Sequence, residues 1–344
     1  MNGPRRSGQV DAGPEPNRGR QGEEIVQSPS VTVITPVYNG GKFIEETVDS
    51  VLAQGYARLE YLVLDDGSTD DTLARLRRFS KHLTVVSHAN VGETQTVNKG
   101  LEMAKGDLLC VVNADDPLLP GAIESAATAY RHNPDAVAVY PDWLEIDSSS
   151  RAVREVRLPD YDILRMLTEF NVALGPGVYF PRRVLSMVGM RDAGLCFTGD
   201  LDFWLRLALH GRLVHVPELL ATHRVHAAAA SSAQRGAQMA SELVRLVEKC
   251  YEHPQLPENL RAQQKVILSR AHFIASYYCG SDLAARAGHI TYCVALAPGP
   301  GSLMLLKHFR YGLWTALPEG MRKSIKKLLT VALPDDQHHS VRRH

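Results

Sequence analysis

The sequence predicts an α/β fold in which helices cover both faces of a mostly parallel sheet, followed by a region made of helices alone. Between residues 31 and 216, short apolar runs alternate with longer segments whose apolar residues recur at helical spacing. Several of these runs are apolar at nearly every position, which is typical of parallel strands buried on both faces. After about Ala227 the strand pattern stops and only helical periodicity continues. The chain is therefore expected to form a parallel α/β domain with a C-terminal all-α extension.

The first part of the α/β pattern contains four expected strands. They cover residues 31–35, 60–64, 83–86 and 107–112, and helices are expected between them over residues 43–52, 70–79 and 93–104. The first strand is rich in β-branched residues and ends at Pro36, and the turn-forming residues Asn39, Gly40 and Gly41 follow it. Each helix collects its apolar residues on one face, as a helix packed on a sheet requires.

The second part extends the sheet and then becomes helical. A helix over 121–131, a strand over 137–140, an antiparallel excursion over 144–157, a helix over 197–210 and a strand over 213–216 are expected. The helices expected beyond them cover residues 233–251, 258–278, 282–297, 303–317 and 321–333. We therefore assign residues 30–230 to the α/β domain and residues 231–344 to the helical region. Residues 1–29 are rich in Gly and Pro with almost no large apolar side chain, and they are expected to form a disordered tail.

Composition excludes several classes of protein. The 344 residues carry 38 Lys and Arg against 38 Asp and Glu, and this balance argues against a nucleic-acid partner, which needs a basic surface. No apolar run approaches the roughly 18 residues that span a bilayer, and no secretory signal is recognisable. The five cysteines are scattered and never spaced as CxxC, so they indicate reduced thiols in the cytoplasm, neither a disulfide framework nor a zinc site.

Polar clusters follow three of the expected strands at the point where each strand ends. These are Pro36 and Tyr38 after the first strand, Asp65 and Asp66 after the second, and Asn113, Asp115 and Asp116 after the fourth. Ligands of open α/β sheets bind at this edge, and adjacent carboxylates suit a divalent cation such as Mg²⁺ or Mn²⁺. Two other interpretations remain open from the residues alone. The acidic residues could simply turn the chain and cap the next helix, or an acid after the second strand could bind a ribose.

Six segments in a fixed order resemble the motif blocks of the family 2 glycosyltransferases. They are VITPVYN over residues 33–39, VLDDGSTD over 63–70, NKG over 98–100, VVNADDPLLP over 111–120, TGDLDFWLRLA over 198–208 and HRVH over 223–226. The resemblance spans roughly residues 30–232. It implies the GT-A fold, a Rossmann-like α/β fold, and a nucleotide-sugar-dependent enzyme that transfers a sugar with inversion. The donor would be a UDP-, GDP- or dTDP-linked sugar, and the acceptor a hydroxyl of a glycan, a lipid-linked saccharide or a small molecule.

The resemblance also implies a role for each matching residue. Pro36, Tyr38 and Asp66 would surround the nucleobase, Asn113 and Asp115 would lie near the ribose, and Arg224 would pair with phosphate. Asp116 and His226 would hold the Mn²⁺ or Mg²⁺ that bridges the diphosphate, where the metal neutralises charge on the departing nucleotide. Asp200 would be the base that takes the proton of the acceptor hydroxyl, with Asp202 as the reserve candidate. His223 and His226 could alternatively be surface histidines without a ligand.

The sequence departs from the family pattern at two positions. Asn113 stands where the family usually has the first Asp of its D-x-D motif, and Gly199 stands where it usually has Glu. These departures leave open a second function, that of a non-catalytic sugar-nucleotide-binding protein of the same fold. A third candidate, a nicotinamide-dependent dehydrogenase, is disfavoured because residues 36–41 lack the G-x-G-x-x-G sequence after the first strand.

The C-terminal segment is the most basic part of the chain. Residues 307–344 contain eight Lys and Arg against three Asp and Glu, an excess of +5. Such a segment, with apolar residues at helical spacing, could attach the protein to an anionic membrane surface at the inner face of the plasma membrane. A helix packed on its neighbours with a solvated basic face is the other interpretation.

Overall fold

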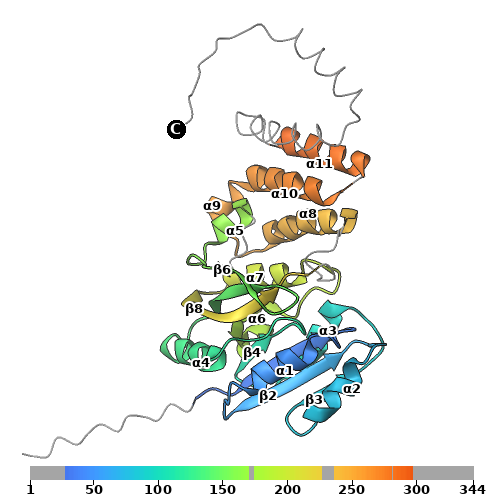
Figure 1. The fold of residues 1–344 in the computed structure, drawn as a ribbon. Helices are drawn as coiled ribbons and strands as arrows, with labels where there is room; N and C mark the ends of the chain where they lie inside the picture. Colours follow the sequence, from blue (N-terminus) through green and yellow to red (C-terminus); the bar gives the residue numbers. More distant parts are fainter. Residues whose placement is uncertain (1–27, 170–173, 227–235, 281, 297–344) are drawn as a thin grey trace, which may run out of the picture.

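The computed structural model describes residues 28–169, 174–226, 236–280 and 282–296 (Figure 1). Nearly all of the expected N-terminal tail lies outside these ranges. So do the helices expected over 303–317 and 321–333, together with the basic segment 307–344. Within the described residues, the structure is a mixed sheet flanked by helices, with further helices stacked on one side of it.

Four parallel strands form one half of the sheet. They are β1 (Val31–Val37), β2 (Leu59–Asp65), β3 (Thr84–Ser87) and β4 (Leu108–Val111), in the order β3-β2-β1-β4. The helices that connect them are α1 (Ile44–Leu52), the short α2 (Thr72–Leu76) with its 3-10 turn η1 (Arg77–Phe79), and α3 (Glu93–Met103). All of these elements were expected from the sequence. Because the strands are parallel, the segments that follow β1, β2 and β4 leave the sheet at one edge.

The other half of the sheet is mixed. The short strand β7 (Tyr179–Pro181) pairs antiparallel with β4 and with β5 (Ala138–Ile146). Strand β6 (Ala152–Val156) forms the expected antiparallel excursion on β5, and β8 (Leu213–Arg224) runs parallel to β5 along its whole length. The sequence did not predict β7, because three residues are too few for a periodic pattern. It also underestimated the lengths of β5 and β8. The second halves of these two strands pair with each other across two register shifts.

Helices cover both faces of the sheet, each over its own hydrophobic cluster. On one face α1 and α4 (Ala122–His132) pack on alternate residues of β1 such as Val31 and Val33. On the other face α3 and α7 (Gly199–Ala208) pack on Ile34, and the short elements η2 (Arg182–Val184) and α6 (Leu185–Val188) lie beside them. Trp204 of α7 is 5% exposed in this second cluster, as expected for a core residue. The predicted α/β class, with helices on both faces, is confirmed.

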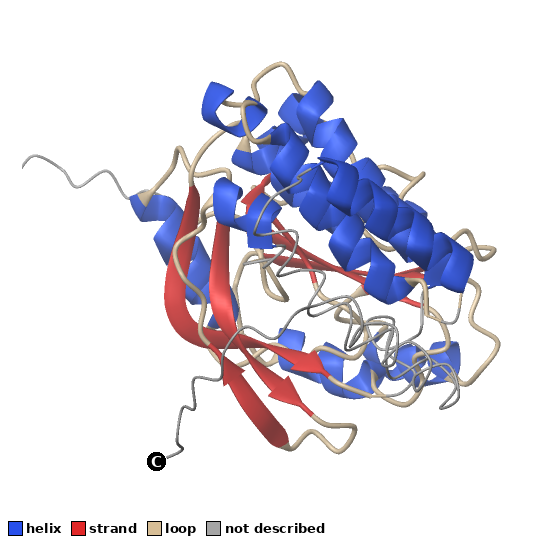
Figure 2. Ribbon diagram, turned by 90° about the horizontal axis from the view of Figure 1, so that it is seen from above, coloured by secondary structure: helices blue, strands red, loops and turns tan. Residues whose placement is uncertain are grey.

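The C-terminal helices form a stack that begins on α7 (Figures 1 and 2). They are α8 (Gly236–Glu252), α9 (Glu258–Arg261), α10 (Gln264–Tyr278) and α11 (Leu283–Leu296), with α5 (Ile163–Glu169) packed against α10. The helix expected over 258–278 is thus divided into α9 and α10. A third cluster joins Leu205 of α7 to Val247 of α8 and Ile267 of α10, so the stack shares a core with the α/β part. None of the helices in the described ranges is long and apolar enough to cross a membrane.

The close packing of α3 on the sheet depends on Gly100, the last residue of the NKG segment. A Cβ atom at this position would lie 2.5 Å from Cγ2 of Ile34 and 3.2 Å from Cδ2 of Leu64. Glycine therefore lets the backbone of α3 approach β1 and β2. This packing explains the glycine of the NKG segment without any role in ligand binding.

We expect Gly100→Ala to lower the free energy of unfolding by about 1–2 kcal/mol, because overpacking costs more than the better helix propensity of alanine returns. The matched control is Gly288→Ala in α11, where the added Cβ meets no atom within 4 Å. That variant should be unchanged or up to about 1 kcal/mol more stable. Urea titration measures both, and a loss of the same size in the two variants would contradict the packing argument.

Candidate active site

The loops after β1 and β2 are tied together at the carboxyl edge of the sheet. Asn39 adopts a left-handed conformation with φ of 51°, and its side-chain oxygen accepts the backbone N–H of Thr69 at 2.8 Å. The N–H of Asn39 in turn donates to the hydroxyl of Ser68 at 2.9 Å. Pro36 is buried within β1, whereas the ring of Tyr38 is 54% exposed. Of these two expected nucleobase contacts, Tyr38 therefore presents a free aromatic face at the edge.

Asp66 lies beneath this edge and closes the loop that precedes α3. Its side chain is buried, and its two oxygens accept the backbone N–H groups of Val91 at 2.7 Å and Gly92 at 2.9 Å. His88 approaches the same carboxylate, with Nδ1 at 3.5 Å from Oδ1. Each carboxylate oxygen keeps one further lone pair, so a nucleobase N–H remains a chemically suitable partner.

Asp116, in the loop after β4, is buried, and each of its carboxylate oxygens accepts a hydrogen bond from the protein. Its Oδ1 accepts the backbone N–H of Arg224 at 2.7 Å, and its Oδ2 accepts the side-chain N–H of Asn113 at 3.0 Å. Burial raises the pKa of Asp116 to about 7, and repulsion by the neighbouring Asp115 carboxylate acts in the same direction. The exposed side chain of Asn113 therefore donates a hydrogen bond to Asp116. An ionised aspartate at position 113 has no N–H and could not donate this bond.

Asp115 is the carboxylate that faces His226. Its Oδ2 lies 2.9 Å from Nε2 of the imidazole, and the two side chains are 29% and 14% exposed. The end of β8 brings His226 there, because Thr222 donates to the carbonyl of Pro117 at 2.7 Å and so fixes the two segments side by side. The ring of Phe43 supports the imidazole, with centroids 5.0 Å apart.

Arg224 lies under the loop after β4 with its side chain completely buried. Its Nε donates to the carbonyl of Asp115 at 2.8 Å, one Nη to the carbonyl of Asp147 at 3.0 Å, and the other to Glu46 at 2.7 Å. The guanidinium also stacks over Phe43 at 4.5 Å from the ring centroid. The expected phosphate contact stays a prediction, but every nitrogen of this side chain already has a protein partner.

The residues at this edge fit a metal that is held jointly by protein and nucleotide. No group of three or more His, Cys, Asp or Glu side chains suited to a metal occurs in the part of the chain that the structure describes. Asp115 and His226 nevertheless offer one oxygen and one nitrogen donor at a single point. Mg²⁺ commonly takes only one or two protein ligands and completes its shell with phosphate oxygens and water, so the pair fits such an ion.

The two candidate bases on α7 have different surroundings. Asp202 is buried and pairs with Arg206 at 2.8 Å and with Lys249 of α8 at 2.8 Å. Asp200 is partly buried, accepts the N–H of Leu201 at 2.8 Å, and forms no ion pair with any described residue. These contacts favour Asp200 over the reserve candidate, because only Asp200 keeps a carboxylate that a substrate could use. Arg206 thus forms a structural ion pair with Asp202 one helical turn away.

Helix α3 connects the loop that Asp66 closes to the start of α7. Its Thr94, two residues after Gly92, donates to the carbonyl of Leu195 at 3.0 Å. Asn98 bonds the backbone of Arg191 in both directions, at 2.8 and 3.0 Å. A Cβ atom at position 199 would lie 3.2 Å from Oγ1 of Thr94. Glycine at this position therefore allows α7 and α3 to lie in close contact.

Several residues of this arrangement had no signal in the sequence. They are Phe43 and Glu46 of α1, Thr94 of α3, and Glu242 and Lys249 of α8. Each is an ordinary residue in or next to an amphipathic helix, and the cited contacts join residues between 45 and 178 positions apart along the chain.

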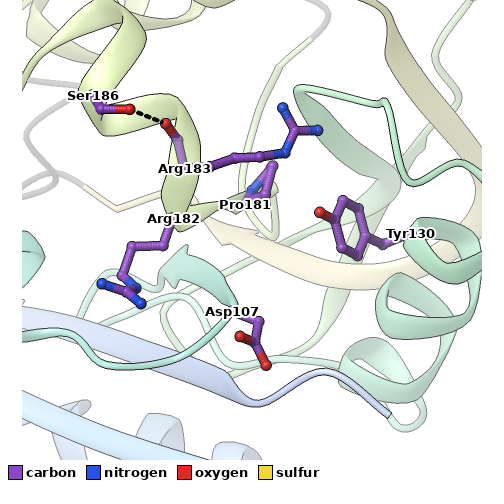
Figure 3. A pocket seen from close by; sticks show the side chains of 6 residues that line it. All are labelled: Asp107, Tyr130, Pro181, Arg182, Arg183 and Ser186. Carbon is purple, nitrogen blue, oxygen red and sulfur yellow. Dashed lines mark hydrogen bonds between the residues drawn. The ribbon is translucent and has the colours of Figure 1, made fainter. Parts of the chain in front are cut away.

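A hollow of about 410 Å³ lies away from these residues, at the opposite edge of the sheet (Figure 3). Its lining residues are Asp107, Tyr130, Pro181, Arg182, Arg183 and Ser186. Asp107 directly precedes β4, so the hollow lies at the amino end of that strand. The two guanidinium groups point away from each other and bond to backbone carbonyls, Arg182 to Gly106 and Arg183 to Pro134 and Ala136. They therefore do not form a joint site for an anion.

Comparison with known proteins defines the class to which this fold and site belong. The model of the family "Glycosyl transferase family 2" matches residues 32–180. An uncharacterized glycosyltransferase of Rickettsia prowazekii is 28% identical over 215 residues, which cover 60% of this chain and 67% of the relative. The chain thus spans about two thirds of the length of that relative.

Two solved structures share the fold. The crystal structure of Staphylococcus aureus TarS 1–349 in complex with UDP-GlcNAc aligns with this chain at a TM-score of 0.61 and 19% sequence identity. The alignment covers 78% of this chain and 82% of the TarS chain. The mannosyltransferase PcManGT from Pyrobaculum calidifontis, in complex with GDP-Man and Mn²⁺, has a TM-score of 0.55 and 21% identity, and covers 87% and 83%. These comparisons define the class of protein, a glycosyltransferase of GT-A fold. Through residues 32–180 the chain belongs to the family 2 glycosyltransferases, and this match argues against the dehydrogenase alternative.

The ion pairs of Asp202 generate a stability prediction. We expect Asp202→Asn to lower the free energy of unfolding by about 1.5–3 kcal/mol, because two cations would lose a buried charged partner. The matched control is Asp71→Asn, which removes an exposed carboxylate that pairs with Arg75 one helical turn away. An exposed pair of this kind contributes less than about 1 kcal/mol. Thermal and urea unfolding measure both losses, and equal losses would argue against a structural role for Asp202.

Proposed function

We propose that this protein transfers one sugar from a nucleoside-diphosphate sugar to a hydroxyl acceptor, with a divalent metal and with inversion at the sugar carbon. The observation that carries this proposal is the pairing of Asp115 with His226 at the same carboxyl edge of the sheet that exposes the ring of Tyr38. A diphosphate there would meet a carboxylate and an imidazole suited to share a metal with it. The nucleotide sugars named with TarS and PcManGT support the donor class.

The donor would be held along the loops after β1, β2 and β4. The ring of Tyr38 would stack on the nucleobase, and Asp66 would accept a base N–H while it keeps the loop before α3 closed. Asn113 would contact the ribose from the exposed side of the loop. Pro36 is buried within β1, so we place it behind the nucleobase and not against it.

Asp115 and His226 would hold the metal once the diphosphate is bound, and the Mn²⁺ named with PcManGT supports this choice of cofactor. A divalent ion supplies positive charge to the departing nucleoside diphosphate. This assignment exchanges the roles expected for the two carboxylates, because Asp116 is buried and both of its oxygens accept protein N–H groups. Asp116 and Arg224 would then position the loop that presents Asp115.

Asp200 would accept the proton of the attacking hydroxyl at the start of α7. Inversion requires the hydroxyl to approach the sugar from the side opposite the diphosphate, so the base and the metal pair must lie on opposite sides of the donor. Glycans, lipid-linked saccharides and small hydroxyl compounds remain the candidate acceptors. A lipid-linked acceptor would agree with attachment of residues 307–344 to an anionic membrane, which stays a prediction because those residues lie outside the described ranges.

The exchanged metal roles can be tested by nucleotide binding. We expect Asp115→Asn to abolish the increase in affinity for UDP or GDP that Mn²⁺ produces in the unchanged protein, because a metal ligand is lost. Asp116→Asn should retain that increase and instead lower the melting temperature. Calorimetric titration with and without Mn²⁺ measures the first effect. If Asp116→Asn alone removes the metal dependence, the original assignment of Asp116 as the ligand is correct.

The base assignment predicts a loss confined to turnover. Asp200→Asn should lower kcat by about 10²–10⁴ without changing the affinity for the donor, because the amide cannot accept the proton. Asp202→Asn serves as the comparison and should reduce stability more than kcat. The assay is release of nucleoside diphosphate from UDP-GlcNAc, GDP-mannose and a dTDP-sugar in the presence of Mn²⁺. Retained turnover in Asp200→Asn would refute the choice of base.

The same assay tests the proposed function as a whole. The unchanged protein should release nucleoside diphosphate from at least one of these donors, and excess EDTA should stop the release. Nucleotide binding without any release or transfer, over a panel of hydroxyl acceptors, would instead support the non-catalytic alternative.

A further inference from the structure

The carboxylate of Glu242, on the C-terminal helix α8, is built into the segment that carries Asp200. Its Oε2 accepts the backbone N–H of Phe197 at 2.7 Å and that of Thr198 at 3.2 Å, and its Oε1 accepts the N–H of Cys196 at 3.1 Å. The hydroxyl of Thr198 lies 3.4 Å from Oε2, and Gln238 donates to Oε1 at 3.1 Å. Glu242 is 5% exposed. One buried carboxylate therefore holds three consecutive backbone N–H groups.

The charge of Glu242 is balanced by hydrogen bonds and not by a cation. Within the described residues no Lys, Arg or His forms an ion pair with it. A buried carboxylate is tolerated only when its lone pairs are satisfied, so the backbone of residues 196–198 and the carboxylate constrain each other. This geometry fixes the direction in which the chain enters α7, two residues before Asp200.

The constraint matters because the residue between Thr198 and Asp200 is Gly199. Because glycine has no side chain, the backbone at Gly199 has more conformational freedom than at any other residue type. The remaining supports of the segment come from other elements, through Thr94 of α3 and Glu242 of α8. A base must lie within hydrogen-bond reach of its proton, and a displacement of about 1 Å can cost about 10²-fold in rate.

We infer that Glu242 of α8 is a positioning residue for the base, although α8 lies outside the segment matched by the family model. This inference rests on the proposed role of Asp200. Glu242 does not touch the substrate; it acts by holding the backbone of residues 196–198, and through it the carboxylate of Asp200.

The test substitutes Glu242→Gln in the full chain, which keeps the size of the side chain and replaces one acceptor oxygen by a donor. We expect kcat for nucleoside diphosphate release to fall about 10-fold or more, with the affinity for the donor within about twofold of the unchanged protein. The control is Val247→Ala, also buried on α8, which removes packing without touching residues 196–198. It should lose similar stability and keep its kcat.

A double variant separates positioning from general destabilisation. If Glu242 acts only through Asp200, then Asp200→Asn combined with Glu242→Gln should be no slower than Asp200→Asn alone. Multiplying effects would show that Glu242 acts elsewhere and would overturn the inference. If Asp200→Asn keeps full turnover, the base assignment itself fails. If Asp200→Asn is inactive but Glu242→Gln has a normal kcat, the base assignment stands and only the positioning role of Glu242 is overturned.

Hydrogen exchange tests the same inference without activity. The amides of residues 196–198 should exchange faster in Glu242→Gln than in Val247→Ala, because only the first variant replaces one of their two acceptor oxygens by a donor. Equal exchange in the two variants would overturn the inference, whatever the outcome of the rate measurements.

Discussion

The candidate site depends on the burial of one positive charge, the guanidinium of Arg224. A cation removed from water must be fully hydrogen-bonded, and its partners here come from three separate parts of the chain. Glu46 reaches it from α1, the carbonyl of Asp115 from the loop after β4, and the carbonyl of Asp147 from the turn after β5. The charge therefore draws these segments together. The backbone N–H of the same residue holds Asp116, so the loop that presents Asp115 is fixed from below.

A second set of contacts joins the two ends of the reaction that we propose. Asp66 closes the loop before α3, Thr94 of α3 holds the segment before α7, and Glu242 of α8 holds that segment from the other side. Donor edge, base and C-terminal helices are thus connected through backbone hydrogen bonds made by single side chains. The C-terminal helices are more than a cover for the sheet, because one of them sets the start of the helix that carries Asp200.

Prediction from the sequence succeeded where the signal was local. The strands of the parallel half, the helices between them and the stop of the strand pattern follow from periodicity within about ten residues, and the structure contains them all. Prediction failed for β7, which has three residues, for residues 141–143 of β5 and for the second half of β8. Those segments are extended because they pair with each other, and pairing between distant strands leaves no periodic pattern in either one.

By itself, the sequence determined the fold class, the order of the motif blocks and the set of acidic residues at the carboxyl ends of the strands. Only the tertiary structure decided how that set is divided: Asp115 faces His226, Asp116 and Asp202 are buried among N–H groups and cations, and Asp200 forms no ion pair with a described residue. Neighbouring aspartates look alike in a sequence. Their roles differ because burial and hydrogen-bond partners come from β8 and α8, whose positions depend on strand register and helix packing over more than 40 residues of intervening chain.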